Sequence, residues 1–262
     1  METNPLPDRG GCLASPLARV GFGVGMLAVL LVLVFVFGSL GDDDEPASDD
    51  IAPVEEPDAT GDDTSPRPES GARTVTLPDG QALNLELFIA ETSGVTIIAA
   101  PSRNADITSI TPVGESLVGG DCANIIAFDA QSVDATPISL YQALFEMLMN
   151  GDFGPIFGEG YGTLGASFTG LPAWQAARDN GADYSFAFAP SDPFPEDFDP
   201  DDVPMNFLFV GEGDTGFVPQ FEQWRAAGFN GATVPGREHG SALFTGENDD
   251  VVLSRIERSL CF

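Results

Sequence analysis

Few residues of this chain have side chains that do acid–base chemistry near neutral pH. His239 is the only histidine and stands in Arg-Glu-His-Gly, and Asp214 stands in Gly-Asp-Thr-Gly. An imidazole acts as a general base and a carboxylate can orient it, provided that the fold brings the two side chains together. Taken alone, His239 is better explained as a surface-loop histidine and Asp214 as a turn residue. A single histidine also excludes His-rich zinc sites.

An acidic segment, 191–203, raises the question of calcium. Asp197, Asp199 and Asp201 alternate in the way that calcium ligands do. A calcium loop of the EF-hand type has Gly after its third acidic residue, whereas Asp202 follows here. A solvated acidic loop is therefore the better interpretation, and we expect neither a metal ion nor a cofactor.

The composition restricts the partners of the chain. Its 262 residues include 41 acidic and 10 basic residues, all of them Arg, for a formal net charge of −31. Such a surface repels phosphate backbones, so we expect no nucleic-acid partner. Three cysteines exclude a disulfide-built scaffold. For Cys122 and Cys261 the sequence leaves both a disulfide and two buried thiols open.

The first third of the chain is predicted to anchor the rest to a membrane. Residues Val20–Leu40 are uncharged, and 21 residues of helix at about 1.5 Å rise per residue span a hydrocarbon core of about 30 Å. Arg9 and Arg19 precede this run, so the positive-inside rule puts 1–19 in the cytoplasm. We therefore expect a single-pass protein of the cell membrane with its C-terminal domain outside the cytoplasm.

Two further segments follow the predicted membrane helix. Residues 41–72 carry twelve acidic side chains and one Arg, a composition typical of a disordered spacer. Residues 73–262 alternate apolar strands with helical patterns, which predicts one α/β domain with a mostly parallel sheet. The expected strands are 74–77, 83–90, 95–100, 123–128, 153–157, 184–189, 206–210 and 232–234. The expected helices are 111–118, 138–150, 217–227 and 251–260, with another after the glycine-rich segment that follows 157.

The order of these elements resembles the α/β-hydrolase fold over about residues 74–262. Five segments carry the resemblance, in chain order: 95–104 (VTIIAAPSRN), 125–132 (IIAFDAQS), 157–163 (FGEGYGT), 209–214 (FVGEGD) and 234–240 (VPGREHG). The acid before the histidine, both after the elbow, is the chain order of that family. The resemblance implies a central sheet flanked by helices. The 16-residue connection after the predicted strand 184–189 is too short for a cap domain.

The resemblance also implies roles for individual residues. Asp214 and His239 correspond to the orienting acid and the general base, and backbone N–H groups of Tyr161 and near Ser102 correspond to the oxyanion hole. The family's nucleophile elbow reads G-x-S-x-G, and the matching stretch 158–162 has Gly160 in the place of serine. Gly160 has no hydroxyl for attack on a carbonyl.

Thr163 and Ser167 follow the predicted elbow, as does the phenol of Tyr161, but in this alignment none of them occupies the turn. Three functions remain open. The first is a membrane-tethered, hydrolase-like protein without serine hydrolysis that binds a small molecule or a protein partner. The second is an active hydrolase of small esters or related acyl compounds that uses Asp214 and His239. The third is a structural module of the cell envelope. The sequence does not predict an oligomeric state.

Overall fold

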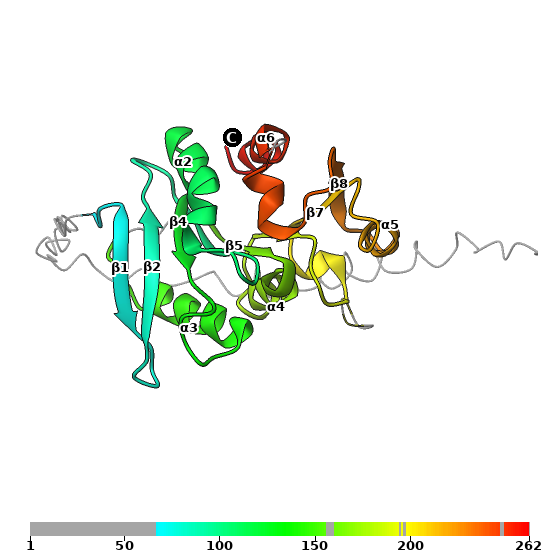
Figure 1. Cartoon of the computed structure of the whole chain (residues 1–262). Coiled ribbons are helices and arrows are strands. Elements are labelled where there is room, and N and C mark those ends of the chain that lie inside the picture. The colour runs from blue at the N-terminus through cyan, green and yellow to red at the C-terminus, as the bar shows by residue number, and fades with distance from the viewer. Residues whose placement is uncertain (1–66, 156–159, 194, 196–197, 247–248, 262) are drawn as a thin grey trace, which may run out of the picture. The chain divides into compact units, whose positions relative to one another are not determined.

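The computed structural model describes residues 67–261 apart from 156–159, 194, 196–197 and 247–248 (Figure 1). The predicted membrane helix 20–40 lies outside these residues, as does most of the predicted spacer. Within the described part of the chain, no helix is long and apolar enough to cross a bilayer. Arg67 donates a hydrogen bond to the carbonyl of Ala90 (2.8 Å), and the first strand begins at Gly71. Residues 67–72, predicted as spacer, therefore belong to the folded unit.

A single sheet of eight strands forms the centre of this unit. Its order is β1-β2-β4-β3-β5-β6-β7-β8, with β1 and β2 antiparallel to their neighbours and the other strands parallel. The strands are β1 (Gly71–Thr76), β2 (Ala82–Phe88), β3 (Val95–Ala100), β4 (Asn124–Phe128), β5 (Gly160–Ala166), β6 (Tyr184–Phe188), β7 (Met205–Gly211) and β8 (Asn230–Val234).

Helices cover both faces of the sheet, which confirms the predicted α/β architecture (Figure 1). Helices α2 and α6 lie together on one face, α3 and α4 lie together on the other, and α5 packs on β7 and β8. Their bounds are α2 (Thr111–Gly119), α3 (Pro137–Met149), α4 (Gly170–Asp179), α5 (Val218–Ala226) and α6 (Asp249–Leu260). Short 3₁₀ helices are η2 (Ile107–Ile110), η3 (Ser167–Thr169), η4 (Pro200–Asp202) and η5 (Gly240–Phe244).

The central strands are apolar because helices bury both of their faces. All five residues of β4 are buried, and so are five of the six residues of β3. A strand that is buried on both faces gains from apolar residues at every position, and for that reason it reads as a continuous apolar run. The predicted bounds of these central strands are accurate for this reason.

Strand β5 begins later than the sequence indicated. The expected strand 153–157 is wrong: Phe153 lies in a turn, and the chain enters the sheet at Gly160. The glycines of β5 allow close packing between strands. A Cβ on Gly162 would lie 2.6 Å from Ile97 Cδ1 and 2.7 Å from Tyr184 Cβ. The glycine-rich segment is therefore strand over its second half, where the sequence predicted a turn.

The acidic segment between β6 and β7 adds no cap domain among its described residues. Only η4 interrupts it, and the Asp199 side chain accepts a hydrogen bond from the Asp201 amide (2.9 Å) at the start of that helix. Acidic side chains at a helix start are favourable because they satisfy free N–H groups and the helix dipole. Within the described residues, no group of three His, Cys, Asp or Glu side chains could hold a metal ion.

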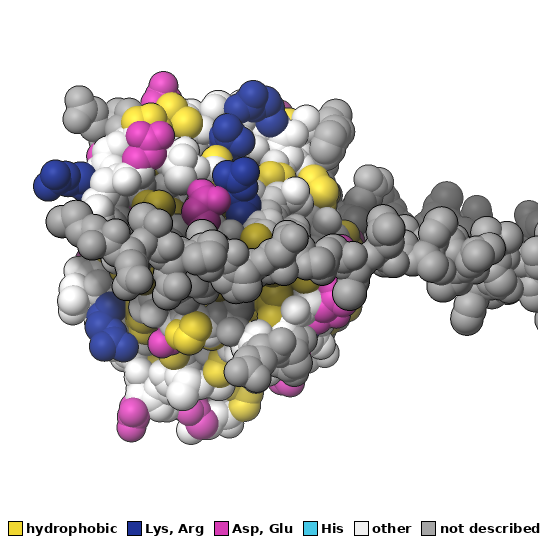
Figure 2. All heavy atoms as spheres, turned by 90° about the vertical axis from the view of Figure 1, so that its right-hand side faces the viewer, with side chains coloured by type: hydrophobic (Ala, Val, Ile, Leu, Met, Phe, Trp, Pro, Cys, Tyr) yellow, Lys and Arg dark blue, Asp and Glu magenta, His cyan; other side chains and the backbone are white. Residues whose placement is uncertain are grey.

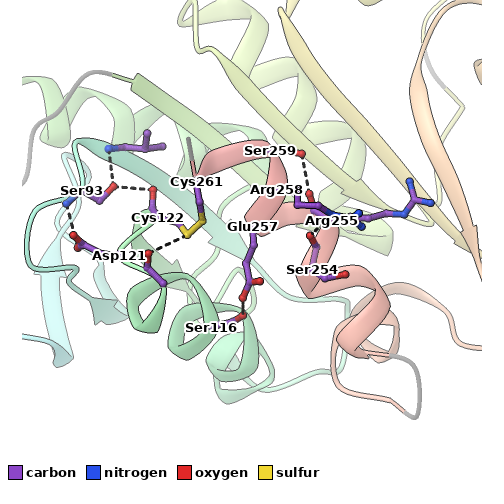
Figure 3. The surroundings of a disulfide bond; sticks show 12 residues. Ser93, Ser116, Asp121, Cys122, Ser254, Arg255, Glu257, Arg258, Ser259 and Cys261 are labelled. Carbon is purple, nitrogen blue, oxygen red and sulfur yellow. Dashed lines mark hydrogen bonds between the residues drawn. A yellow bond between two sulfur atoms is a disulfide. The ribbon is translucent and has the colours of Figure 1, made fainter.

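A disulfide joins Cys122 to Cys261, which decides between the two alternatives that the sequence left open. The two Cα atoms are 4.8 Å apart although 139 residues separate them in the chain. Figure 3 shows that the bond ties the end of α6 to the segment that leads from α2 into β4. Ser116 of α2 also donates a hydrogen bond to Glu257 of α6. The last helix is thus fixed to the sheet at the amino ends of its parallel strands.

Candidate active site

The turn that follows β5 holds Ser167 in a left-handed backbone conformation. Its φ is +55°, which is strained for a residue with a side chain, and the chain then continues through η3 into α4. A nucleophile elbow is such a strand-to-helix turn, and it holds its serine at the carboxyl edge of the sheet. Gly165 makes the turn sterically feasible, because a Cβ there would lie 2.2 Å from the carbonyl oxygen of Thr169.

Thr169 replaces the second glycine of the G-x-S-x-G pattern in this turn. Its hydroxyl accepts a hydrogen bond from the Ala166 amide (2.8 Å) and lies 3.1 Å from the carbonyl oxygens of Ala100 and Pro101. The turn is therefore tied to the end of β3 by a threonine side chain. A search for the complete glycine pattern misses Ser167. The signal that could have found it is Gly165-Ala166-Ser167, where Gly165 and Ala166 end a buried strand and Ser167 follows it.

The predicted position of the nucleophile, Gly160, is wrong. Gly160 is the first residue of β5, and at about 3.3 Å per strand residue it lies about 20 Å from the turn that holds Ser167. Tyr161, which was expected to supply an oxyanion donor, lies beside it in the strand, and its amide donates to Asp183 Oδ2 (3.2 Å). Both residues are at the opposite end of β5 from Ser167.

The structure brings Asp214 and His239 together and aims the histidine at Ser167. His239 Nδ1 lies 2.7 Å from Asp214 Oδ2, and His239 Nε2 lies 3.1 Å from Ser167 Oγ. The three residues follow β7, β8 and β5 in the sheet, each at the carboxyl end of its strand. Open α/β sheets place their sites at this edge.

Glycines let the Asp214 and His239 loops approach each other closely. A Cβ on Gly211 would lie 2.4 Å from the Glu238 carbonyl oxygen, and one on Gly213 would lie 2.3 Å from Arg237 Cγ. The Gly213 amide donates to the Gly236 carbonyl (2.5 Å), which fixes the two loops side by side. Any larger residue at these glycines would push the two loops apart.

The donor and acceptor capacities of Asp214, His239 and Ser167 determine which atoms carry the protons in this hydrogen-bond network. The Asp214 carboxylate only accepts, so His239 Nδ1 carries the hydrogen and Nε2 is left as an acceptor for the Ser167 hydroxyl. Ser191 Oγ lies 3.1 Å from Ser167 Oγ and can then donate to it. Ser191 also donates its amide to the Ser167 carbonyl (3.1 Å). No sequence pattern indicated Ser191, because its contact with Ser167 arises only where β5 and β6 end side by side.

Solvent reaches the base while the acid is more protected. The His239 side chain is 37% exposed and that of Asp214 is 13% exposed. The ring of Phe217 lies 4.5 Å from the imidazole, centroid to centroid, and covers one side of it. The carboxylate that pairs with Nδ1 is thus better protected from solvent than the imidazole.

Ser102, near which a backbone oxyanion donor was predicted, has its own amide bound to another side chain. The Ser102 N–H donates to Ser241 Oγ (2.7 Å), whereas Ser102 Oγ accepts from the Ser241 amide (2.6 Å) and from the Ser241 hydroxyl (2.9 Å). Ser102 Oγ has thus accepted two hydrogen bonds, and its own proton is left to donate. A Cβ on Gly240 would lie 2.2 Å from Ser102 Oγ and 3.1 Å from Ser167 Cβ, so the Ser102 hydroxyl is next to Ser167.

Several solved structures with a similar fold are described as esterases or hydrolases. An esterase from Pyrococcus furiosus, Pf2001, is 19% identical over 73% of this chain and 91% of its own, with a TM-score of 0.54. XC6422 from Xanthomonas campestris, described as an α/β serine hydrolase without a lid, is 17% identical over 73% and 92%, with a TM-score of 0.51. Dienelactone hydrolase from Anabaena variabilis is 17% identical over 73% and 96%, with a TM-score of 0.54. Neither a protein-family model nor a curated protein matches the chain.

Proposed function

We propose that this chain, which has the α/β-hydrolase fold, is a serine hydrolase that cleaves small carboxylic esters. One observation carries the proposal: Ser167, on a strained turn, lies 3.1 Å from the nitrogen of His239 that is free to accept a proton. His239 is in turn oriented by Asp214 at 2.7 Å. A nucleophile, a base and an orienting acid at these distances are what acyl transfer requires.

The proposed reaction proceeds in two halves. Ser167 Oγ attacks the ester carbonyl while His239 Nε2 takes the hydroxyl proton, and the imidazolium then returns that proton to the departing alkoxide. Water next attacks the acyl group on Ser167, with His239 again as the base. The acid leaves, and Ser167 regains its proton. Asp214 stays ionised throughout and stabilises the imidazolium.

Two donors are proposed for the negative oxygen of the tetrahedral intermediate. The first is the amide of Phe168, because this residue lies in the first turn of η3 and α4, where N–H groups have no acceptor within the helix. The second is the Ser102 hydroxyl, since its own amide is occupied by Ser241. In this assignment the predicted contribution of Ser102 is retained, but through its side chain.

The alternative of a binding protein without hydrolysis depended on Gly160 at the nucleophile position. Ser167 at the turn removes that reason, so the active hydrolase, which the sequence also left open, is the function that the geometry supports. The Asp214 and His239 assignments are common to both interpretations.

We also propose that residues 20–40 tether the hydrolase to the cell membrane with the catalytic domain outside the cytoplasm. The uncharged run and the preceding Arg9 and Arg19 support this placement. The Cys122–Cys261 disulfide is a second support, because such bonds persist in oxidising compartments. Protease added to intact cells should release the domain, and complete protection would contradict the placement.

A serine-directed phosphonate probe and a short chromogenic ester test the catalytic proposal. The full-length chain should hydrolyse the ester and be labelled on Ser167, and Ser167→Ala should lose both properties. Ser191→Ala is the matched control, since its hydroxyl is only 3.1 Å from that of Ser167. It should keep the label. Ester hydrolysis that survives in Ser167→Ala would show that this serine is not the nucleophile.

A further inference from the structure

A cavity of about 390 Å³ opens beside Ser167, with a charge on each side of the nucleophile. It is lined by Arg103, Ser167, Phe168, Ser191 and Asp192. Arg103 follows β3 and Asp192 follows β6, and these two strands flank β5 in the sheet. The two charges therefore enter the cavity from opposite sides of the turn that holds Ser167.

Arg103 is held next to the nucleophile by an aromatic ring. Its guanidinium carbon lies 5.0 Å from the centroid of Phe168, the residue directly after Ser167, at a distance typical of a cation–π contact. Among the described residues, no carboxylate lies within ion-pair distance of Arg103. The positive charge is thus fixed in place by packing and is not neutralised by a neighbouring acid.

This charge stands out against the rest of the protein. The chain carries 41 acidic and 10 basic residues, so its overall field repels anions. Salt screens that field beyond about 10 Å at about 0.1 M, which leaves the nearest charges to decide what binds. Figure 2 shows acidic and basic side chains interspersed on the face that carries β8 and α5, in keeping with a surface whose potential is set locally.

The direction of the reaction decides which part of a substrate meets Arg103. His239 must deliver a proton to the leaving group, so the leaving group lies on the side of β7 and β8. The acyl group then extends the other way, over the end of β3. A guanidinium binds a carboxylate through two parallel hydrogen bonds, a geometry that a neutral acyl group cannot use.

We propose that Arg103 selects esters whose acyl group ends in a carboxylate, such as monoesters of short dicarboxylic acids. Asp192, on the leaving-group side, disfavours an anionic leaving group. This assignment rests on the proposed hydrolase function and adds a substrate class to it. Arg103 acts here by binding the substrate, and the bond-breaking steps remain those of Ser167 and His239.

Two esters with one leaving group test the proposal on the full-length chain. The 4-nitrophenyl monoester of glutaric acid carries the terminal carboxylate, and 4-nitrophenyl pentanoate is its neutral counterpart. We expect kcat/KM to favour the monoester by tenfold or more. Arg103→Gln should lose at least tenfold on the monoester, mainly through KM, and change less than twofold on the pentanoate. Arg103→Glu should prefer the pentanoate, and Arg103→Lys should keep part of the preference for the monoester.

Arg178→Gln is the matched control. Arg178 also lies over an aromatic ring, 5.2 Å from the centroid of Trp174, but it ends α4 away from Ser167. Its removal changes the net charge equally and should leave the preference intact. Equal losses on both esters in Arg103→Gln, or a Ser167-dependent wild type that favours the pentanoate, would overturn the substrate class and leave the hydrolase proposal standing. No hydrolysis of either ester and no phosphonate label would overturn both.

Discussion

A cavity lies at each end of the parallel strands, and the larger of the two is not the one that contains Ser167. The cavity at the amino ends has a volume of about 530 Å³ and is lined in part by the disulfide, Asp121 and Tyr184. The cavity at the carboxyl ends has about 390 Å³ and contains Ser167. The proposed site is therefore not the larger of these two cavities. What distinguishes the smaller cavity is a serine on a strained turn, opposite a nitrogen that can accept its proton.

Polar groups at the amino ends mostly satisfy one another. Asp121 accepts hydrogen bonds from the Thr92 amide (2.9 Å) and hydroxyl, and these bonds, with that of the hydroxyl the largest cause, hold the pKa of its carboxyl below the usual range. Ser93 Oγ donates to the Cys122 carbonyl (2.7 Å). Such bonds fix a loop and leave no base free. We therefore expect changes at the amino ends to affect stability, and changes at the carboxyl ends to affect turnover.

An Asp→Asn substitution at each end of the parallel strands should give the largest difference in kcat. Asp214→Asn should lower kcat by about 10⁴-fold, because an amide favours the wrong tautomer of His239 and does not stabilise the imidazolium. Asp121→Asn, at the other end, should leave kcat unchanged within about twofold. The kcat of both variants is measured by ester hydrolysis. A small effect of Asp214→Asn would show that the short contact to His239 has no part in the reaction.

Removal of the disulfide should lower stability and leave turnover unchanged, the opposite of what we expect for Asp214→Asn. Cys122→Ser/Cys261→Ser should lower the free energy of unfolding by about 2–5 kcal/mol, since the bond closes a long loop in the unfolded chain. Chemical denaturation gives this value, and wild type under reducing conditions is the control. The folded variant should keep its kcat. A loss of kcat without a loss of stability would mean that the two ends of the sheet are coupled.

Ser102→Ala tests the side chain assigned to the oxyanion hole. We expect kcat to fall by about 10²-fold with KM nearly unchanged, because the donor acts on charge that develops only in the transition state. Ser241→Ala is the matched control: it removes the acceptor of the Ser102 amide and keeps the Ser102 hydroxyl. Equal effects of the two variants would assign Ser102 to the structure of the loop. A wild-type kcat in Ser102→Thr, which keeps a hydroxyl at this position, would support the hydroxyl as the oxyanion donor.

Glycine substitutions at the two ends of β5 should give the smallest effects. We expect a loss of stability and activity at the carboxyl end and little change at the amino end. A Cβ on Gly165 would meet backbone, 2.2 Å from the Thr169 carbonyl oxygen, so Gly165→Ala should cost about 1–3 kcal/mol and displace Ser167. A Cβ on Gly160 would lie 3.1 Å from the tip of the Tyr184 ring and 3.2 Å from Asp183 Oδ2, both of which can move. Gly160→Ala should therefore keep its activity. Thermal melts and ester hydrolysis separate the two variants.

The sequence by itself predicted an α/β domain with a mostly parallel sheet and located most of its strands. Strands β3 and β4 are buried on both faces, so their apolar runs marked them within a residue. The Asp214 and His239 loops were recognisable because the segments 209–214 and 234–240 resemble loops of the α/β-hydrolase fold in that chain order, and the structure brings the two side chains to 2.7 Å. These features are local, since each depends on residue types within a few positions of one another.

Only the tertiary structure decided where β5 begins and ends, and hence that Ser167 occupies the turn after it. Glycine permits both a sharp turn and a close approach between strands, so the run around Gly160 could be read either way until Ile97 and Tyr184 were placed beside it. Thr169, by taking the position of the second glycine, left the G-x-S-x-G pattern around Ser167 incomplete. The pairing of Cys122 with Cys261 and the opposition of Arg103 and Asp192 were equally hidden. Contacts between distant segments depend on how the strands align in space. That alignment results from the packing of the whole domain, so the residue types near a single position do not reveal it.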